Sequence, residues 1–493
     1  MDTGLQERVA GLLQEAGVRI GGTQPQDIQV HDPRFFARVM AHGSLGLGES
    51  YMDGWWDANV LDEFLVHLMQ AHLDERVHGW REVADALKAR LFNLQVGQGS
   101  YEVGRRHYDL GNDLYQAMLG QRLVYSCGYW RNADDLDAAQ EAKLDLVCRK
   151  LGLRPGQRVL DIGCGWGEAL KFAAERYGVS GVGVTISQEQ AEFARELCAG
   201  LPIEIRLQDY RELHEPFDAI FSIGMFEHVG DKNYASFFEV AKRCLSPRGL
   251  LLLHSIGTNI SRHRTDPWIA RYIFPNSMLP SAVQITKAFE GRFVLEDWHN
   301  FGTDYDLTLQ AWRRNVEAAW PRLDARYDEH FRRMWRFYLA GSMATFRCRH
   351  AQLWQLVLSP EGVPGGYVAP RRVHGRGGAL SVGKGSDPGV RSHFAEMGSD
   401  PNPNKKNRPV SRAAFVSGDC AGDQLPAPVR PRFSSSGSIC GSWPAKSRNS
   451  CMASTLPPLD SRVARKWSPF LRLRPPLSLN HFWVLASSTS DQM

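Results

Sequence analysis

The chain has 493 residues, 43% of them hydrophobic and 23% charged, which is enough for about two or three domains with a sizeable core. The net charge of +4 hides an asymmetry, because residues 371–493 carry 18 Lys and Arg against 7 Asp and Glu, whereas residues 1–370 carry 40 against 47. The acidic body argues against bulk binding of nucleic acid, which needs a basic surface to neutralise phosphates.

The cellular compartment is indicated by the absence of targeting signals. No apolar run is long enough to span a bilayer, and the start Met1-Asp2-Thr3-Gly4 lacks a basic flank followed by an apolar stretch. Nine scattered Cys without a CxxC pair favour reduced thiols over a disulfide framework or a zinc site. We expect a cytoplasmic protein that holds no metal and contacts the inner face of the cell membrane only peripherally.

Residues 1–95 are predicted to form a small helical domain. Apolar residues recur at helical spacing, as in Leu61, Phe64, Leu65 and Leu68. A Gly-rich segment, residues 44–56, ends in paired tryptophans. One interpretation places both indole rings in the core of a helical cap. The other is that apolar surface here meets lipid, since indole rings suit the boundary between water and hydrocarbon.

Residues 96–370 are predicted to form an α/β domain. Five apolar runs look like strands, and amphipathic segments of helical length lie between several of them, which predicts a parallel sheet covered on both faces. The expected strands are Arg158 to Gly163, Ser180 to Ile186, Ile203 to Asp209, Phe217 to Gly224 and Gly249 to Ile256. The expected helices are Glu168 to Tyr177, Gln188 to Ala199 and Tyr234 to Leu245, followed by helices near 307–320 and 329–349 and a strand at 353–358.

Residues 371–493 differ from the rest of the chain. Ser, Pro and Gly make up 44 of these 123 residues, and the isolated apolar clusters show no sustained period. We expect a disordered, basic, low-complexity tail with no packed domain. Contact with anionic lipid and the absence of any function are both open interpretations of it.

The strongest local motif is VLDIGCGWGE at residues 159–168, an apolar strand that runs into Gly-x-Gly-x-Gly and then a helix. The glycines allow a sharp turn and the close approach of a ligand. Their spacing differs from the Gly-x-Gly-x-x-Gly that places a pyrophosphate at a helix start. S-adenosylmethionine has no phosphate yet needs this close approach, and Asp161 could organise the loop or meet its amino group through water.

Polar residues follow the next two strands. Thr185 and Gln190 stand where dinucleotide enzymes usually place an acid for the ribose, so they could serve it neutrally, while Ser187 is equally well explained as a helix N-cap. Gln208 and Asp209 follow the third strand, where they could accept the adenine amine. An ordinary polar strand end is the alternative.

Glu227 follows the fourth strand and His254 lies near the end of the fifth. Because the carboxyl ends of strands border the ligand crevice in open α/β sheets, both could face the reactive group of a cofactor. Each has a structural alternative: His254 as a hydrogen-bonded core residue, Glu227 as a helix-start carboxylate, and Cys127 as a small buried apolar residue.

From about residue 5 to 370, the chain resembles the bacterial cyclopropane-fatty-acyl-phospholipid synthases. The resemblance rests on long and unusual strings, whereas the tail has no counterpart that we recognise. These strings are residues 44–56, HYDLGND at 107–113, residues 159–167, GMFEHVG at 224–230, DPW at 266–268, YIFPN at 272–276 and EDWHNFG at 296–302.

The resemblance implies a Rossmann-like methyltransferase that moves the methyl group of S-adenosylmethionine to a cis double bond of an unsaturated phospholipid and closes a cyclopropane by losing a proton. It also implies a homodimer. The bicarbonate site of the family maps onto Cys127, Glu227, His254, Ile256 through its backbone, and Tyr305. Its cofactor positions map onto Tyr125, Ser126, Asp161, Ile162, Gly163, Cys164, Gly165, Trp166, Gly167, Glu168, Thr185, Ile186, Ser187, Gln188, Glu189, Gln190, Gln208 and Asp209.

The chemistry is consistent with that implication. An alkene is a poor nucleophile, so the methyl donor must be aligned and held close. Attack leaves a carbocation, which bound bicarbonate can deprotonate without being alkylated as a strong base would be. We expect Glu227 to accept the proton of the anion, and histidine, tyrosine and a backbone amide to donate to it. Rings of Tyr129, Trp130, Phe226 and Tyr305 could stabilise the cation.

Three other functions remain open. A related fatty-acyl methyltransferase could stop at a methylene or methyl branch. A dinucleotide oxidoreductase is disfavoured by the glycine spacing and by Thr185 in place of an acid. A non-catalytic lipid-binding scaffold would need neither Glu227 nor His254. In the favoured interpretation, residues 1–95 dock the enzyme on lipid or pair two catalytic units.

Overall fold

The computed structural model describes residues 3–73, 111–323 and 325–370. The chain divides into two compact units, Met1–Gly385 and Ser386–Met493, and every described residue belongs to the first. The expected domain boundary near residue 95 and the expected tail, residues 371–493, lie outside the described residues. None of the described helices combines the length and hydrophobicity needed to cross a bilayer.

The N-terminal segment is largely helical, as the sequence predicts, but it also contains a small sheet that was not expected. Its elements are α1 (Thr3–Glu15), β1 (Ile28–Val30), α2 (Arg34–Met52), β2 (Trp56–Ala58) and α3 (Leu61–Gln70). The strands β1 and β2 pair antiparallel. Three residues are too short a run to show strand periodicity. Helix α2 is broken at Gly43, where φ is 54°.

The central sheet has seven strands in the order β5-β4-β3-β6-β7-β9-β8. The five predicted strands are all present and parallel. The bounds are β3 (Arg158–Ile162), β4 (Ser180–Thr185), β5 (Ile203–Leu207), β6 (Phe217–Ile223), β7 (Leu245–Thr258), β8 (Val294–Asn300) and β9 (Ala351–Ser359).

The prediction of a wholly parallel sheet is wrong at one edge. Strand β9 runs antiparallel to both β7 and β8, so the sheet is mixed. Strand β8, with the sequence VLEDWHN, was not predicted. It lies at the edge of the sheet, and of its residues only Asp297 is buried. An edge strand therefore has no continuous apolar run by which to recognise it.

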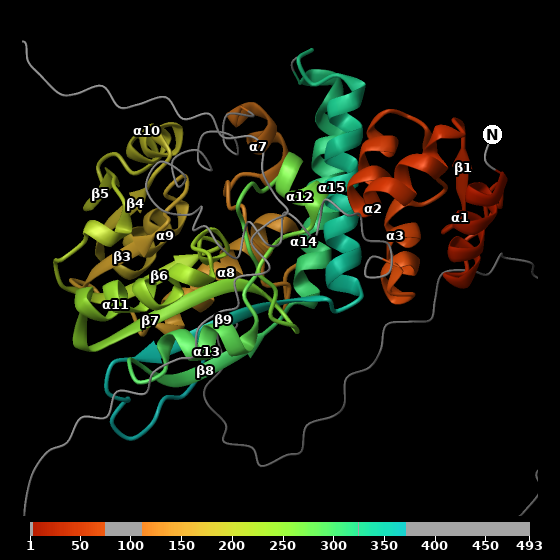
Figure 1. Ribbon diagram of the computed structural model, residues 1–493. Coiled ribbons are helices and arrows are strands. Elements are labelled where there is room, and N and C mark those ends of the chain that lie inside the picture. Colours follow the sequence, from red (N-terminus) through yellow and green to blue (C-terminus); the bar gives the residue numbers. More distant parts are fainter. Residues whose placement is uncertain (1–2, 74–110, 324, 371–493) are drawn as a thin grey trace, which may run out of the picture. The chain divides into compact units, whose positions relative to one another are not determined.

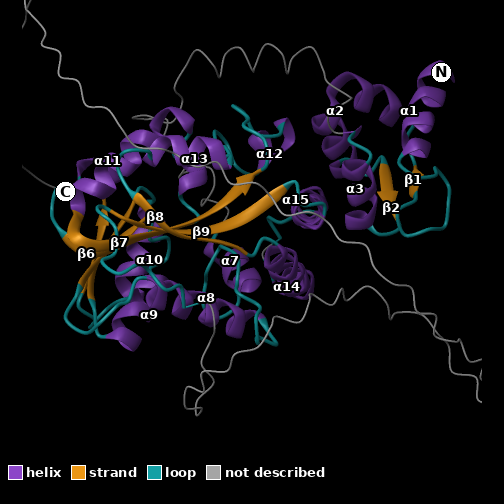
Figure 2. Ribbon diagram, turned by 90° about the horizontal axis from the view of Figure 1, so that it is seen from below, coloured by secondary structure: helices purple, strands orange, loops and turns teal. Residues whose placement is uncertain are grey.

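Helices cover both faces of the sheet (Figure 2). Helices α8 (Leu136–Lys150), α9 (Glu168–Tyr177) and α10 (Gln188–Leu197) pack on one face, and α11 (Tyr234–Cys244) and α13 (Ala282–Phe289) pack on the other. Successive residues of a strand point to opposite faces. Thus Val159 packs with α8 and α9, and Leu160 packs with α11 and α13. The three predicted crossover helices are α9, α10 and α11.

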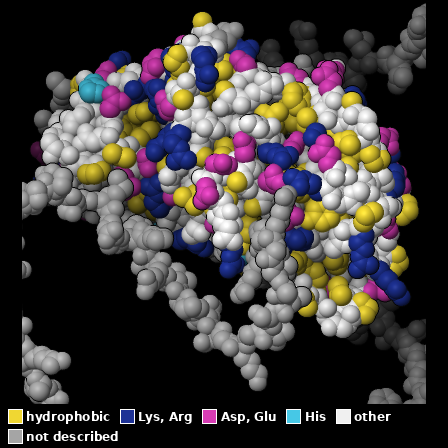
Figure 3. Space-filling view, turned by 180° about the vertical axis from the view of Figure 1, so that it is seen from behind, with side chains coloured by type: hydrophobic (Ala, Val, Ile, Leu, Met, Phe, Trp, Pro, Cys, Tyr) yellow, Lys and Arg dark blue, Asp and Glu magenta, His cyan; other side chains and the backbone are white. Residues whose placement is uncertain are grey.

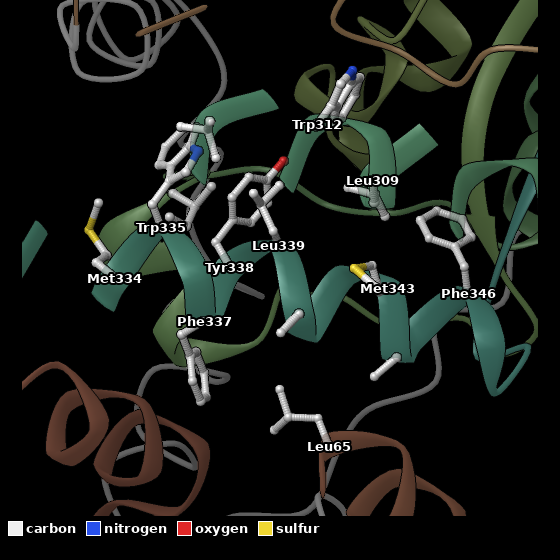
Figure 4. Packing of buried hydrophobic residues seen from close by; sticks show 14 of the residues in the cluster. Leu65, Leu309, Trp312, Met334, Trp335, Phe337, Tyr338, Leu339, Met343 and Phe346 are labelled. Carbon is white, nitrogen blue, oxygen red and sulfur yellow. The ribbon is translucent and has the colours of Figure 1, made fainter. Parts of the chain in front are cut away.

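The remaining helices join the N-terminal segment to the sheet. They are α7 (Asn112–Leu119), α12 (Pro267–Tyr272), α14 (Thr303–Ala319) and α15 (Glu329–Arg347). Helices α2 and α3 lie beside α15 (Figure 1). Phe337 of α15 points towards α2 and α3, and Leu65 of α3 points back towards α15 (Figure 4). Tyr338 and Phe346 of α15 point to the other side, towards α14. One continuous hydrophobic cluster contains all four residues.

The paired tryptophans occupy different environments. Trp56 is fully buried in this cluster, so the prediction of a core position is confirmed for it. The ring of Trp55 is only partly buried, and the guanidinium groups of Arg34 and Arg38 lie 4.5 and 4.7 Å from its centroid. Contact of this segment with lipid stays a prediction. On the face shown in Figure 3, basic and acidic side chains are interspersed with small hydrophobic patches.

Candidate active site

The glycine turn joins β3 to α9 and leaves room at its tip. Gly163, Gly165 and Gly167 all have positive φ, at 89°, 53° and 91°, which L side chains rarely adopt. A Cβ on Gly163 would lie 2.5 Å from the side chain of Met225, whereas one on Gly165 would meet nothing within 4 Å. Gly165 therefore borders open space into which a side chain would project.

A single pocket runs from this turn along the carboxyl ends of the strands. Most residues that were expected to hold the cofactor line it. These are Tyr125, Ser126, Asp161, Ile162, Gly163, Cys164, Gly165, Trp166, Glu168, Thr185, Ile186, Ser187, Gln190, Gln208 and Asp209. Gly167, Gln188 and Glu189 do not line it: Gly167 packs against Ala194 and Cys198, and the other two begin α10.

Several residues of this pocket were not predicted from the sequence. They include Lys143, Tyr210, Arg211, Met225 and His228. Arg211 and Tyr210 directly follow the predicted Asp209, and Met225 and His228 flank Glu227, so proximity in sequence could have indicated them. Lys143 lies on α8 before the sheet begins, where no motif marks it.

Thr185, Ser187 and Gln190 form a connected turn after β4. The Ser187 hydroxyl accepts from the Gln190 backbone N–H at 3.3 Å, which makes Ser187 the N-cap of α10, as its structural alternative required. The Thr185 hydroxyl donates to Gln190 Oε1 at 3.1 Å and accepts from the Ser187 N–H at 3.2 Å. All three residues are buried and also face the pocket.

Asp209 is partly engaged within the protein. Its Oδ1 accepts from the backbone N–H and from Nε of Arg211 at 3.0 and 2.9 Å, and its Oδ2 accepts from Nη2 at 2.5 Å. Burial alone would raise the pKa of Asp209, but the hydrogen bonds from Arg211 outweigh it and hold the pKa below its usual value. Asp209 is therefore a fixed carboxylate at the β5 end of the pocket.

Asp161 is an unpaired buried carboxyl at the end of β3. It is 2% exposed, and its Oδ1 has no hydrogen-bond partner among the described residues. Burial raises its pKa to about 8, against the opposing charge of Lys143. A group of this kind is expected where a ligand supplies the missing donor.

Glu227 lies behind the pocket, in a short 3-10 helix (Phe226–His228) that follows β6. Its Oε1 accepts from the backbone N–H of Ile256 at 2.7 Å, and its buried Oε2 has no hydrogen-bond partner among the described residues. Burial raises the pKa of Glu227 to about 7. Because the Ile256 amide is already engaged, it holds Glu227 in place and is not free to donate to an anion as the sequence analysis expected.

His254 is a neutral donor in this structure. It is 1% exposed, and burial lowers its pKa well below the usual value. Its Nδ1 lies 3.2 Å from Nε2 of Gln355, its cross-strand neighbour on β9. With the amide oriented in this way, Gln355 donates to Nδ1, so the proton of His254 resides on Nε2. That Nε2 is buried and has no acceptor within the described part of the chain.

Cys127 and Tyr305 complete the predicted cluster. Cys127 is fully buried, and burial raises the pKa of its thiol well above the usual value, so it is not a thiolate nucleophile. The Tyr305 ring stacks on Phe346 with centroids 4.5 Å apart. Burial raises the pKa of Tyr305 well above its usual value, and the neighbouring Tyr338, Cys127 and Glu227 side chains raise it further.

Four aromatic residues were expected near the reacting atoms, and for Phe226 this prediction is wrong. Phe226 is fully buried on the other side of the sheet, where its ring stacks on Tyr234 at 4.3 Å and packs on α11. Tyr129 packs edge-on against Phe301, and Trp130 donates from Nε1 to Thr308 at 2.9 Å. Both lie in or against the cluster that contains Cys127 and Tyr305.

The two groups of residues adjoin each other. Cys127, Glu227, His254, Ile256 and Tyr305 do not themselves line the pocket, but the chain neighbours Ser126 and His228 do. The Gly224 N–H, at the pocket, donates to the His254 carbonyl at 2.9 Å. The predicted acid–base cluster and the glycine turn thus belong to one region at the carboxyl ends of β3, β6 and β7.

Comparison with known proteins identifies the family. The model of the mycolic acid cyclopropane synthetase family matches residues 97–356. The chain is 52% identical over 361 residues to the cyclopropane-fatty-acyl-phospholipid synthase of Escherichia coli K12, which covers 73% of this chain and 94% of the relative. It belongs to the cyclopropane synthase family of S-adenosylmethionine-dependent methyltransferases.

Two further proteins are similar to this chain, one in sequence and one in structure. The tuberculostearic acid methyltransferase UfaA1 of Mycobacterium tuberculosis is 32% identical over 382 residues, 72% of this chain and 88% of the relative. The solved cyclopropane synthase MmaA2 from the same organism is 32% identical and covers 52% of this chain and 97% of its own, with a TM-score of 0.50. The fold is therefore the Rossmann-like fold of these methyltransferases.

The pocket of this cyclopropane synthase family member fits S-adenosylmethionine. Gly165 leaves open space where a side chain would obstruct the ligand, and Asp161 offers an unpartnered carboxyl to the amino group. The glycine turn allows close backbone approach without the arrangement that binds a pyrophosphate.

Proposed function

We propose that this enzyme transfers a methylene group from S-adenosylmethionine to the cis double bond of an unsaturated phospholipid acyl chain, and that a bicarbonate ion held by Glu227 and His254 acts as the base. One observation carries the proposal. Two buried polar atoms of opposite hydrogen-bonding character, the Oε2 acceptor of Glu227 and the Nε2–H donor of His254, have no partner among the described residues.

Such a pair of atoms fits bicarbonate. The ion carries one O–H donor, which Glu227 Oε2 can accept, and oxygen acceptors, to which His254 Nε2 and the Tyr305 hydroxyl can donate. Unpaired buried donors and acceptors are costly, and Glu227 contacts β7 at Ile256, two residues from His254. The two unpaired atoms therefore support a small polar ligand at this site. Glu227 must be ionised to accept, which its pKa of about 7 permits at and above neutral pH.

The residues of this site suit a reaction that creates positive charge on a hydrocarbon chain. Bound S-adenosylmethionine supplies an electrophilic methyl group, and bound bicarbonate supplies a weak base. Among the described residues, the proposed acid–base side chains Glu227, His254 and Cys127 are all buried. His254 is neutral and the Cys127 thiol is protonated, because burial disfavours the charged form of each.

Aromatic rings near this cluster can stabilise the developing cation. Tyr305 and Tyr129 are buried in the same cluster as Cys127. Each ring face turned to a cation is worth about 1–2 kcal/mol in a desolvated site. An aromatic face stabilises the carbocation without forming a bond to it, whereas a carboxylate could add to it. The carbocation then persists until the cyclopropane closes.

A phospholipid substrate is supported by the name of the Escherichia coli relative. We further propose that the enzyme works as a homodimer in the cytoplasm, bound peripherally to the inner face of the cell membrane, with residues 1–95 as the docking or pairing region. Because the described part of this region shares a hydrophobic cluster with α15, deleting it would expose core. Surface substitutions are the suitable test of docking.

The decisive experiment is to incubate the full chain with S-adenosylmethionine and vesicles of unsaturated phospholipid. We expect an acyl product heavier by one CH2 whose proton spectrum has lost the vinyl signals and gained cyclopropane signals. A methyl-branched or methylene product would identify the related methyltransferase activity instead. Binding of vesicles without any product would leave only a lipid-binding role.

A further inference from the structure

Lys143 is a buried lysine that faces the ligand pocket, and burial lowers the pKa of its amine to about 7. It is 0% exposed, lies on α8 and lines the pocket. Its Nζ donates to the Ser126 hydroxyl at 3.0 Å. Within the described ranges it forms no ion pair: Asp161 acts on it only at longer range, and Glu168 is held by Arg122 at 2.7 Å.

The other fully buried lysine of the same helix, Lys150, forms an ion pair with a carboxylate. Lys150 is also 0% exposed, but its Nζ lies 3.1 Å from Asp297 Oδ2. A buried ammonium normally requires such a partner, because removing it from water is costly. Lys143 has no such carboxylate at hydrogen-bond distance, and its pKa is lowered instead. Because Lys143 lines the pocket, an anion bound there would favour the ammonium form and supply the missing partner.

The position of Lys143 along the pocket indicates which group of a bound ligand could be its partner. Residues at the carboxyl ends of β5, β4, β3 and β6 line the pocket in spatial order, starting with Asp209 and continuing with Thr185, Asp161 and Met225. An extended nucleoside–amino acid ligand would place its nucleoside at the β5 and β4 ends. Its amino acid part then lies at the β3 end, beside Asp161 and Lys143.

We propose that Lys143 binds the α-carboxylate of S-adenosylmethionine through its Nζ, opposite Asp161, which takes the α-ammonium group. The assignment rests on S-adenosylmethionine as the ligand of this pocket. The carboxylate is the only anionic group of that molecule, and a charge-assisted hydrogen bond to it would complete the coordination of Nζ begun by Ser126. No bond forms or breaks at Lys143, so it is a binding residue.

Bicarbonate offers the same chemistry from a second source. Lys143 lies within electrostatic range of Cys127 and His254. The geometry favours the carboxylate, because Lys143 lines the pocket whereas Cys127 and His254 do not. Titration without carbonate and with added bicarbonate distinguishes the two anions.

The test compares S-adenosylmethionine with its decarboxylated form, which lacks only the α-carboxylate. Both ligands are titrated calorimetrically, in carbonate-free buffer, into the full wild-type chain, Lys143→Met and the matched control Lys150→Met. We expect the wild type to bind S-adenosylmethionine about 10–100-fold more tightly than the decarboxylated form. For Lys143→Met, the Kd values of the two ligands should agree within about threefold. Both should be close to the Kd of the wild type for the decarboxylated form. Lys150→Met should be less thermostable and keep the wild-type preference.

Each other outcome has a definite meaning. Equal affinity of the wild type for the two ligands would overturn the proposal, even if Lys143→Met does not fold. A preference retained by Lys143→Met would also overturn it. If adding bicarbonate changes the affinity of the wild type but not that of Lys143→Met, and both keep the preference, the partner is bicarbonate and the proposal is wrong. If the wild type binds neither ligand, the proposed function itself fails.

Discussion

Gln355 on β9 donates from Nε2 to Nδ1 of His254 on β7, and these residues are direct cross-strand neighbours. With the amide in this orientation the ring proton lies on Nε2, which is buried and has no acceptor among the described residues. Gln355 is itself fully buried. The tautomer of the candidate active-site histidine is therefore set by a residue on an antiparallel strand that has no part in the cofactor pocket.

Gln355→Glu should reverse this tautomer. A carboxylate at this position accepts from Nδ1–H, which leaves Nε2 as an acceptor that repels bicarbonate. We expect kcat to fall about 100-fold, as when one anion-stabilising donor is removed, while the Kd of S-adenosylmethionine changes less than about threefold. The 15N signals of the His254 ring should report the exchange of protonated nitrogen. Gln355→Leu, which imposes neither tautomer, should lose less activity; an equal or greater loss would contradict the tautomer argument.

Ionisation of Glu227 should set the acid limb of the pH profile. Burial raises its pKa to about 7, and only the carboxylate form can accept the proton of bicarbonate. Activity should therefore fall as pH decreases through about 7, with one proton taken up. Glu227→Gln should bind S-adenosylmethionine normally and lose nearly all turnover. Glu290→Gln, on an exposed residue at the end of α13, should leave the profile unchanged. An acid limb that persists unchanged in the residual activity of Glu227→Gln would assign it to another group.

The same substitution should stabilise the protein at high pH. Because the folded-state pKa of Glu227 is above its unfolded value, the stability it contributes is fully present below about pH 4.5 and is lost as pH rises through 7. The loss amounts to roughly 3 kcal/mol for a shift of about 2.5 pH units. Glu227→Gln should therefore melt a few degrees above the wild type at pH 8, and the difference should shrink at pH 6. Thermal melts that show no pH-dependent difference would contradict the assigned pKa.

Bicarbonate removal should arrest turnover without affecting cofactor binding. In buffer stripped of carbonate we expect kcat to fall at least about tenfold and to recover on adding bicarbonate, because the site would then lack its base. The Kd of S-adenosylmethionine, measured in the same buffers, should stay constant. An unchanged rate after stripping would remove bicarbonate from the mechanism.

Gly165→Ala should obstruct the pocket. A Cβ at this position projects into open space bordering the pocket, at a φ of 53°. The variant should bind S-adenosylmethionine at least about tenfold more weakly because a methyl group occupies the place of the ligand. Gly156→Ala is the matched control: Gly156 has a φ of 84°, also has nothing within 4 Å of its Cβ, and does not line the pocket. Equal binding by the two variants would show that Gly165 is merely a turn residue.

The ion-pair network between α3 and the C-terminal helices should matter for stability. Asp62 is 4% exposed and accepts from Arg313 and Arg347 at 2.7 and 3.0 Å. Burial would raise its pKa, but these two arginines outweigh burial and hold it below the usual value. Asp62→Asn should lower the melting temperature by several degrees at pH 7, since it removes a buried carboxylate that accepts from both arginines.

The pH dependence of that loss has a definite sign. A depressed carboxyl pKa contributes stability that is present above the unfolded pKa and disappears as pH falls through the folded pKa. The difference between Asp62→Asn and the wild type should therefore diminish in acid. Asp32→Asn removes an exposed pair with Arg34 and should change the melting temperature by less than about 1 °C. A difference for Asp62→Asn that is independent of pH would point to packing instead of charge.

The parallel strands, the crossover helices and most cofactor contacts were predictable from the sequence. Strands β3, β4 and β6 are largely buried on both faces, so their apolar runs identify them, and the glycine turn has a distinctive spacing. The predicted positions around Asp161 and Thr185 line the pocket for this reason. Strand β8 was not predictable, because an edge strand with charged residues looks like a loop.

Long-range contacts explain the remaining errors. Phe226 immediately precedes Glu227 in sequence, but the short 3-10 helix turns its ring to the opposite side of the sheet. Nothing local to Ile256 shows that its amide is engaged by Glu227, nor that Lys143 reaches the pocket from α8. These relationships depend on how the elements pack, which residue spacing along the chain does not encode.

Helix α15 is enclosed along most of its length, since every residue from Phe331 to Cys348 is buried or partly buried. Such a helix gains its stability from its neighbours on all sides. Loss of α2 and α3 would therefore expose apolar side chains of α15 to water and destabilise the helix. Loss of α14 would expose apolar side chains on the other side of α15. We conclude that the front helices and the methyltransferase body form one cooperative folding unit, which should melt in a single calorimetric transition.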